Sequence, residues 1–123
     1  MRYLTDYKRV IGGGAGHAGT EHHWAMHVSS IALAFLLPVW IYIFGSALGS
    51  SQADVLATFE RPFPAIVTAL TLIVGMRHFA KGAQTLFEDY SRGTLRHLLV
   101  FGASALSYLV MATGLFALVR IAI

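Results

Sequence analysis

Three long apolar stretches, separated by short polar segments, dominate the pattern of hydrophobic and polar residues along the chain. A helix rises about 1.5 Å per residue, so about 20 apolar residues cross a hydrocarbon core of roughly 30 Å. The pattern therefore predicts an all-α membrane protein with three transmembrane helices, over residues 24–48, 63–88 and 96–120. These helices form one membrane domain, 24–123, which follows an N-terminal arm, 1–23.

The N-terminal arm is basic and rich in glycine, and it lacks the continuous apolar core of a cleavable signal peptide. We expect it to be retained and to lie against partner subunits. Its segment Gly14–Gly19 matches the G-x-G-x-x-G pattern of dinucleotide-binding proteins. No strand precedes this segment and a membrane span follows it, so the match does not indicate a nucleotide site.

The connections between the spans carry turn and helix-start residues. The first loop, 45–61, includes a short amphipathic piece to which we assign a structural role. Pro62 and Pro64 suit the first turn of the second helix. After the second span, Gly93 permits a positive φ and Thr94 is a predicted N-cap for the third helix. Small residues of the third span suggest helix packing, and Tyr108 there receives no predicted role.

Composition and charge agree with a membrane protein and give its orientation. Of the 123 residues, 56% are hydrophobic and 12% charged, which is too apolar for a small soluble domain. There is no Cys, which excludes disulfides and thiolate chemistry. Lys and Arg residues outside the spans or at their ends are concentrated on one side. Five of them lie in the arm or around the connection between the second and third spans, namely Arg2, Lys8, Arg9, Arg92 and Arg96, and two, Arg61 and Arg120, lie on the other side. The positive-inside rule therefore predicts a cytoplasmic N-terminus, and the net charge of +3 does not indicate nucleic-acid binding.

The second span carries a polar stripe with a histidine inside it. Spacings of four and three residues bring one set of small or polar residues to a single helix face: Thr71, Gly75, His78, Gly82, Thr85 and Asp89. An ionisable residue within a span suggests a functional site. Gly75 and Gly82 on either side of His78 would leave a shallow groove for a flat macrocycle. Small residues also pack membrane helices closely, so the spacing alone leaves ligation and packing equally open.

His78, Gly82, Asp89 and Tyr90 form the pattern H-x3-G-x6-D-Y in the second of three apolar segments. In this the chain resembles the small hydrophobic membrane anchor subunits of succinate dehydrogenase, respiratory complex II. The resemblance implies that His78 is an axial ligand of haem b, shared with a histidine of a second anchor subunit. It also implies that Tyr90 hydrogen-bonds ubiquinone, with Asp89 orienting Tyr90 or supplying protons.

The same resemblance implies the partners and the location. The implied partners are the second anchor (cytochrome b) subunit, an iron–sulfur subunit with its clusters and a flavoprotein subunit with FAD. The chain would then be a subunit of an enzyme and would contribute the quinone-reduction site of that enzyme. The membrane would be the bacterial cytoplasmic membrane, or the mitochondrial inner membrane in a eukaryote.

Basic residues near His78 are candidates for the haem propionates. Arg77 and Lys81 flank it, and either can pair with a propionate or extend its charge towards the membrane surface. His27 stands where the family often has arginine, ahead of a V-[ST] pair, which makes it a further propionate candidate. Because His23 and His27 are four residues apart near His22, a separate metal site and a polar helix entrance at the headgroups are the alternatives.

Two other classes of protein compete with this interpretation. A small transporter would be expected to carry a carboxylate deep within its spans. Five of the six acidic residues lie outside the predicted spans, and the sixth, Glu88, is the last residue of the second span. A structural or assembly subunit without a cofactor is the second alternative. A visible absorption spectrum separates both from the haem hypothesis.

Overall fold

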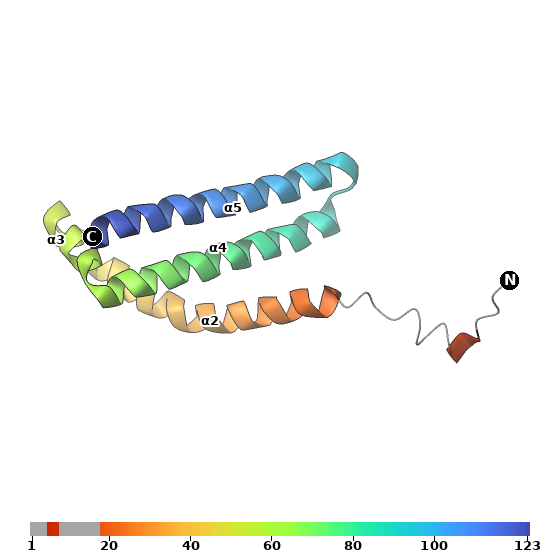
Figure 1. Cartoon of the computed structure of the whole chain (residues 1–123), viewed down its shortest axis with the longest axis horizontal. Coiled ribbons are helices and arrows are strands. Elements are labelled where there is room, and N and C mark those ends of the chain that lie inside the picture. The colour runs from red at the N-terminus through yellow and green to blue at the C-terminus, as the bar shows by residue number, and fades with distance from the viewer. Residues whose placement is uncertain (1–4, 8–17) are drawn as a thin grey trace.

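The computed structural model describes residues 5–7 and 18–123, and its ordered elements are four helices (Figure 1). They are α2 (Ala18–Ala47), α3 (Gln52–Glu60), α4 (Pro62–Tyr90) and α5 (Gly93–Ala122). Three of them, α2, α4 and α5, are long and apolar enough to cross a membrane. The predicted all-α fold with three candidate spans is confirmed. The Gly14–Gly19 segment and the basic residues of the arm lie outside the described residues, apart from Ala18 and Gly19 at the start of α2.

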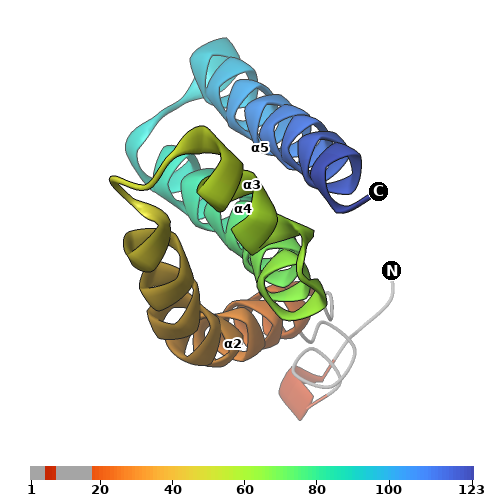
Figure 2. The same ribbon diagram turned by 90° about the vertical axis from the view of Figure 1, so that its left-hand side faces the viewer.

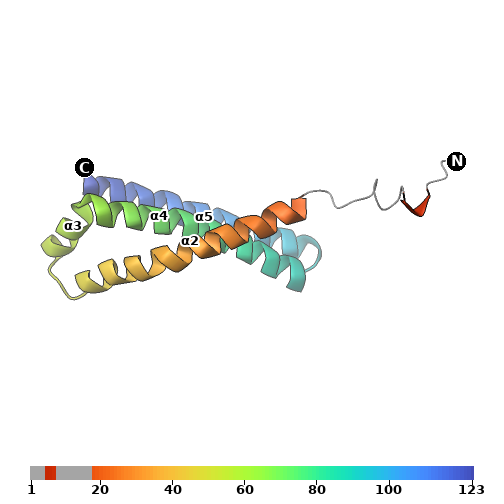
Figure 3. The ribbon, with the colours of Figure 1, turned by 90° about the horizontal axis from the view of Figure 1, so that it is seen from below.

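The three long helices form a curved layer with α4 in the middle. Both α2 and α5 pack against α4, whereas α2 and α5 do not contact each other within the described part of the chain. Figure 2 shows this arrangement close to end-on, and Figure 3 shows α2 crossing α4 obliquely. The short helix α3 closes one end of the layer, where it contacts all three long helices. The central position of α4 means that its side chains can meet residues from both neighbours.

The loop before α4 is more ordered than the sequence pattern indicates. Its amphipathic piece folds into α3, which begins at a capping arrangement around Ser51. The Ser51 hydroxyl accepts the Asp54 backbone N–H at 3.2 Å and donates to the Asp54 carboxylate at 2.7 Å. Such a reciprocal cap satisfies backbone donors that the first helical turn leaves free.

The ends of α4 and α5 test the predicted helix starts. Helix α4 begins at Pro62, and its first turn contains the expected prolines. Gly93 adopts a φ of 64°, as its position in the turn predicts. The prediction that Thr94 is the N-cap is wrong, because α5 already begins at Gly93 and its N-cap is Arg92, without a side-chain capping bond. The connection is therefore only Ser91 and Arg92, and Gly93 allows the chain to turn with a positive φ.

Very few side chains are buried within the chain. The buried apolar residues are Ile43, Ala47, Pro64, Val67 and Leu118. Large apolar side chains are exposed along all of the long helices, for example Phe35 on α2, Phe79 on α4 and Phe101 on α5. A soluble protein of this size does not expose so much apolar surface. The surfaces of the three helices therefore suit lipid and partner helices.

Candidate functional site

The polar stripe of α4 faces helix α2. Four pairs of residues meet across this interface, and they follow one antiparallel register. The distance between His22 Nε2 and Thr85 Oγ1 is 3.0 Å, and the distance between Ser29 Oγ and His78 Nδ1 is 2.7 Å. A methyl group placed on Gly82 would lie 3.8 Å from Met26 Cε. One placed on Gly75 would lie 3.9 Å from Leu33 Cδ2. Side chains of α2 therefore lie beside both glycines, and the predicted groove for a macrocycle stays a prediction.

Gly75 and Gly82 lie at the face of α4 that meets α2, and small residues at such faces are typical of packed membrane helices. Two short polar contacts join the helices at the same interface. The histidine thus lies in a packing interface within this chain, and its role as a ligand stays a prediction.

A cleft opens at the edge of this interface, where His78 is half-buried. The cleft has a volume of about 340 Å³ and receives side chains from all three long helices. Helix α4 contributes His78 with Arg77 and Lys81, α2 contributes Ser29, and α5 contributes Tyr108. Most of the remaining lining is small or apolar, from Ala25, Met26, Val28, Ala32, Ile73, Val74 and Ala80.

The polar groups of this cleft are only partly satisfied. His78 Nδ1 has its partner in Ser29, whereas His78 Nε2 has no hydrogen-bond partner among the described residues. The side chains of Arg77 and Lys81 are exposed and make no hydrogen bond or ion pair within the described part of the chain. The cleft therefore offers one imidazole nitrogen and two cations to a ligand that lies along an apolar surface.

The other predicted site residues lie away from this cleft. Tyr90 is 84% exposed at the last residue of α4, and Asp89 beside it is exposed. Neither side chain has a hydrogen-bond partner among the described residues. At about 1.5 Å per residue, the twelve residues from His78 to Tyr90 span about 18 Å along the helix axis. The two predicted sites are thus separate positions on one helix.

The histidines near the start of α2 do not form a metal centre in the described residues. The rings of His23 and His27 lie 4.5 Å apart, both exposed, while His22 bonds to Thr85. No group of three His, Asp or Glu side chains within residues 5–7 and 18–123 is close enough to hold a metal ion. His27 does not line the cleft of His78, so its predicted role stays a prediction.

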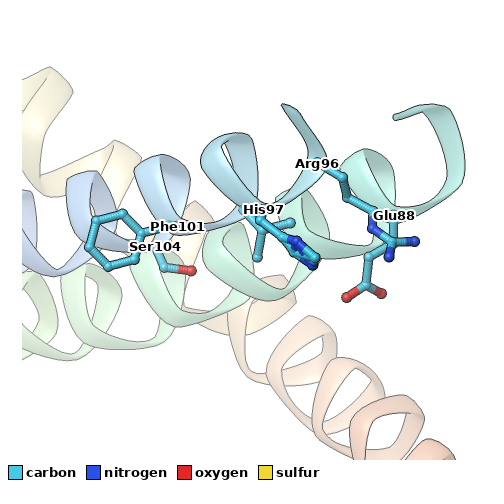
Figure 4. A pocket seen from close by; sticks show the side chains of 6 residues that line it. Glu88, Arg96, His97, Phe101 and Ser104 are labelled. Carbon is cyan, nitrogen blue, oxygen red and sulfur yellow. The ribbon is translucent and has the colours of Figure 1, made fainter. Parts of the chain in front are cut away.

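A second cleft, of about 530 Å³, lies between the end of α4 and the start of α5 (Figure 4). Glu88, Arg96 and His97 stand at its polar end, and Val100, Phe101 and Ser104 continue along α5. Gln84 donates a hydrogen bond of 2.8 Å to the Glu88 carboxylate. No predicted site residue lines this cleft, although Glu88 is two positions before Tyr90.

Comparison with known proteins identifies the family. Residues 1–116 match the family described as succinate dehydrogenase/fumarate reductase transmembrane subunit. The chain belongs to this family. A succinate dehydrogenase hydrophobic membrane anchor subunit from Paracoccus denitrificans is 44% identical over 120 residues, covering 98% of this chain and 93% of the relative. One from Rickettsia conorii is 29% identical over 103 residues, covering 77% and 80%. No solved structure matches the chain.

Membership of the succinate dehydrogenase/fumarate reductase family confirms the resemblance predicted from four residues of α4. Two residues at the His78 cleft were not predicted from the sequence. Ser29 lies on one face of α2, together with His22, Met26 and Leu33. These residues are spaced by four, three and four positions, and this spacing could have identified the face of α2 that meets α4. Tyr108 reaches the cleft only through the packing of α5 on α4, and no sequence signal indicates that.

Proposed function

We propose that this chain is the membrane anchor subunit of succinate dehydrogenase, that His78 ligates haem b, and that Tyr90 forms part of the ubiquinone site. The observation that carries the proposal is the imidazole of His78 inside a candidate span, which lines a cleft and whose Nε2 has no partner among the described residues. A polar group at this depth is expensive unless it has a partner. Family membership and the Paracoccus relative support the same assignment.

The residues of the cleft fit a haem. Neutral imidazole is a common axial ligand, and bound haem supplies one-electron redox chemistry at a potential set by its ligands and burial. His78 offers Nε2, and the unpaired Arg77 and Lys81 side chains can neutralise two propionates. Apolar lining from α2 and α4 suits the macrocycle face. The cleft is open on one side, which leaves room for the second anchor subunit and its axial histidine.

The remaining predicted haem contacts stay predictions. His27 is exposed on α2 and would reach a propionate near the membrane surface. Gly75 and Gly82 lie beside side chains of α2, and their predicted contact with the haem stays a prediction.

Ubiquinone, the substrate, would bind at the end of α4. The Tyr90 hydroxyl is exposed and has no partner among the described residues, so it is free to donate to a quinone carbonyl. Such a bond strengthens as negative charge develops on that oxygen during reduction. Asp89 is adjacent and would orient Tyr90 or supply protons. Electrons would come from the flavoprotein and iron–sulfur subunits, which hold FAD and the clusters.

The orientation and location are part of the same proposal. The positive-inside rule puts the start of α2 and the α4–α5 connection on the cytoplasmic side of the bacterial cytoplasmic membrane. Tyr90 then lies on the side where the soluble subunits dock.

The test is the reduced-minus-oxidised spectrum of the purified complex carrying His78→Ala. We expect the b-type haem signal to be lost or shifted, because one axial ligand is removed. The His27→Ala complex is the comparison, and we expect it to retain haem with an altered potential. An unchanged spectrum in an intact His78→Ala complex would exclude His78 as the ligand and return the chain to a structural role.

A further inference from the structure

We propose that Ser29 of α2 is a positioning residue for His78. The Ser29 hydroxyl accepts the hydrogen bond from the Nδ1–H of His78 and so directs Nε2 to the haem iron. This inference rests on the proposed function, since it takes His78 as the haem ligand. It adds a residue from a different helix to the site. Its basis is the 2.7 Å contact between Ser29 Oγ and His78 Nδ1, which is part-buried between α2 and α4.

Proton counting assigns the direction of this hydrogen bond. A neutral imidazole carries one N–H, so when Nε2 binds a metal the proton must be on Nδ1. A hydroxyl has one proton and two acceptor lone pairs. Ser29 Oγ also lies 3.1 Å from the Met26 carbonyl oxygen one turn earlier in α2. Ser29 can therefore donate its own proton to Met26 and accept the proton of His78.

The surroundings leave Ser29 as the partner of the ring. His78 makes no other side-chain hydrogen bond among the described residues, so Ser29 is what holds one edge of the imidazole. The antiparallel register holds Ser29 there, through the His22–Thr85 contact on one side and the Leu33–Gly75 contact on the other. The imidazole is thus fixed at Nδ1 by α2 and open at Nε2.

Such a partner sets two properties of a metal ligand. It holds the ring in one orientation, and it raises the basicity of the ligating nitrogen. A neutral hydroxyl acceptor raises that basicity less than a carboxylate does. Removing it should let the ring rotate, weaken the bond to iron and raise the haem midpoint potential, because a weaker donor stabilises ferric iron less.

The experiment compares four variants of the assembled complex with the unmodified complex: Ser29→Ala, Ser29→Thr, Ser30→Ala and His78→Ala. Ser30 is the matched control, because it is the next residue and its hydroxyl donates to the same Met26 carbonyl at 2.7 Å without contacting His78. Haem content, midpoint potential, the electron paramagnetic resonance spectrum of ferric haem and the rate of haem transfer to a scavenging apoprotein are measured.

We expect Ser29→Ala to hold haem about 10- to 100-fold less tightly, with a higher midpoint potential and a broadened resonance spectrum. Ser29→Thr should restore these values, because its hydroxyl can make both bonds. Ser30→Ala should match the unmodified complex. If His78→Ala removes haem while Ser29→Ala behaves like Ser30→Ala, this inference alone fails. If His78→Ala leaves the haem spectrum unchanged, the proposed function fails and the positioning role fails with it.

Discussion

At the scale of single residues, His78 differs from several hydroxyl side chains of the spans, because its hydrogen-bond partner lies on another helix. Thr71, Thr85 and Ser107 each donate to a backbone carbonyl of their own helix four residues earlier. Such bonds need no neighbour and satisfy a hydroxyl in hydrocarbon. His78 cannot reach its own backbone in this way, and its partner comes from α2. The half-satisfied imidazole therefore depends on how the helices pack.

Tyr90 provides a residue-scale test of the quinone site. In Tyr90→Phe the ring remains and the donor is lost, so the developing charge on the quinone loses about 1 to 3 kcal/mol of stabilisation. This corresponds to a roughly tenfold to hundredfold loss in quinone reduction. Succinate oxidation with an artificial acceptor that draws electrons before the quinone should be unchanged, because the flavin and clusters lie in other subunits.

Both activities are assayed on the same assembled complex, with haem content as the control. Equal loss of the two activities would show that Tyr90 acts through assembly. Full retention of quinone reduction would leave Tyr90 as an aromatic residue of the membrane interface.

At the scale of elements, α4 relates differently to its two neighbours. Its contact with α2 is formed by glycines and paired polar groups, whereas its contact with α5 includes a close approach at Gly114. A methyl group on Gly114 would lie 2.5 Å from Leu72 Cδ2. No such contact exists at Gly102 on the same helix, where the space within 4 Å is open. The two glycines of α5 therefore have different roles.

We expect Gly114→Ala to destabilise the α4–α5 pair relative to Gly102→Ala by about 1 to 3 kcal/mol, the range for an overpacked contact. Replacing glycine by alanine stabilises a helix by about 1 kcal/mol at either position, so this contribution cancels when the two variants are compared. The measurement is the temperature at which the detergent-solubilised complex dissociates. Equal dissociation temperatures would mean that Leu72 moves aside without strain.

At the scale of the whole molecule, the chain has too little internal contact to be understood alone. Exposed large apolar side chains occur on every face of the three-helix layer, including Tyr42 on α2 and Phe116 on α5. The C-terminus and α3 lie at one end of the layer, opposite the start of α2 and the α4–α5 connection (Figure 1). Arg92 and Arg96 mark the latter end, and Arg61 and Arg120 the former. Lipid and partner subunits must cover the exposed faces.

Single cysteines test the orientation, because the chain contains none. Ser50→Cys places a thiol in the α2–α3 connection, and Thr94→Cys places one in the first turn of α5, both at exposed positions. With a membrane-impermeant reagent, we expect Ser50→Cys to react from outside intact spheroplasts and Thr94→Cys to react only in inside-out vesicles. The opposite pattern would place the N-terminus outside. Reaction after detergent treatment is the control for access.

The sequence alone determined the number and approximate extent of the spans, because a hydrocarbon core of roughly 30 Å sets a minimum apolar length that does not depend on packing. It also determined the stripe around His78 on α4, since helical periodicity follows from spacing. The N-cap of α5 was mispredicted at Thr94, because the helix begins at Gly93 and its N-cap, Arg92, makes no side-chain capping bond. Only the tertiary structure decided which surface meets the stripe. Ser29 and Tyr108 come from other helices. The spacing along α2 indicates which of its faces can meet α4, but the register that pairs Ser29 with His78 and the packing of α5 that brings Tyr108 to the cleft follow from contacts between helices.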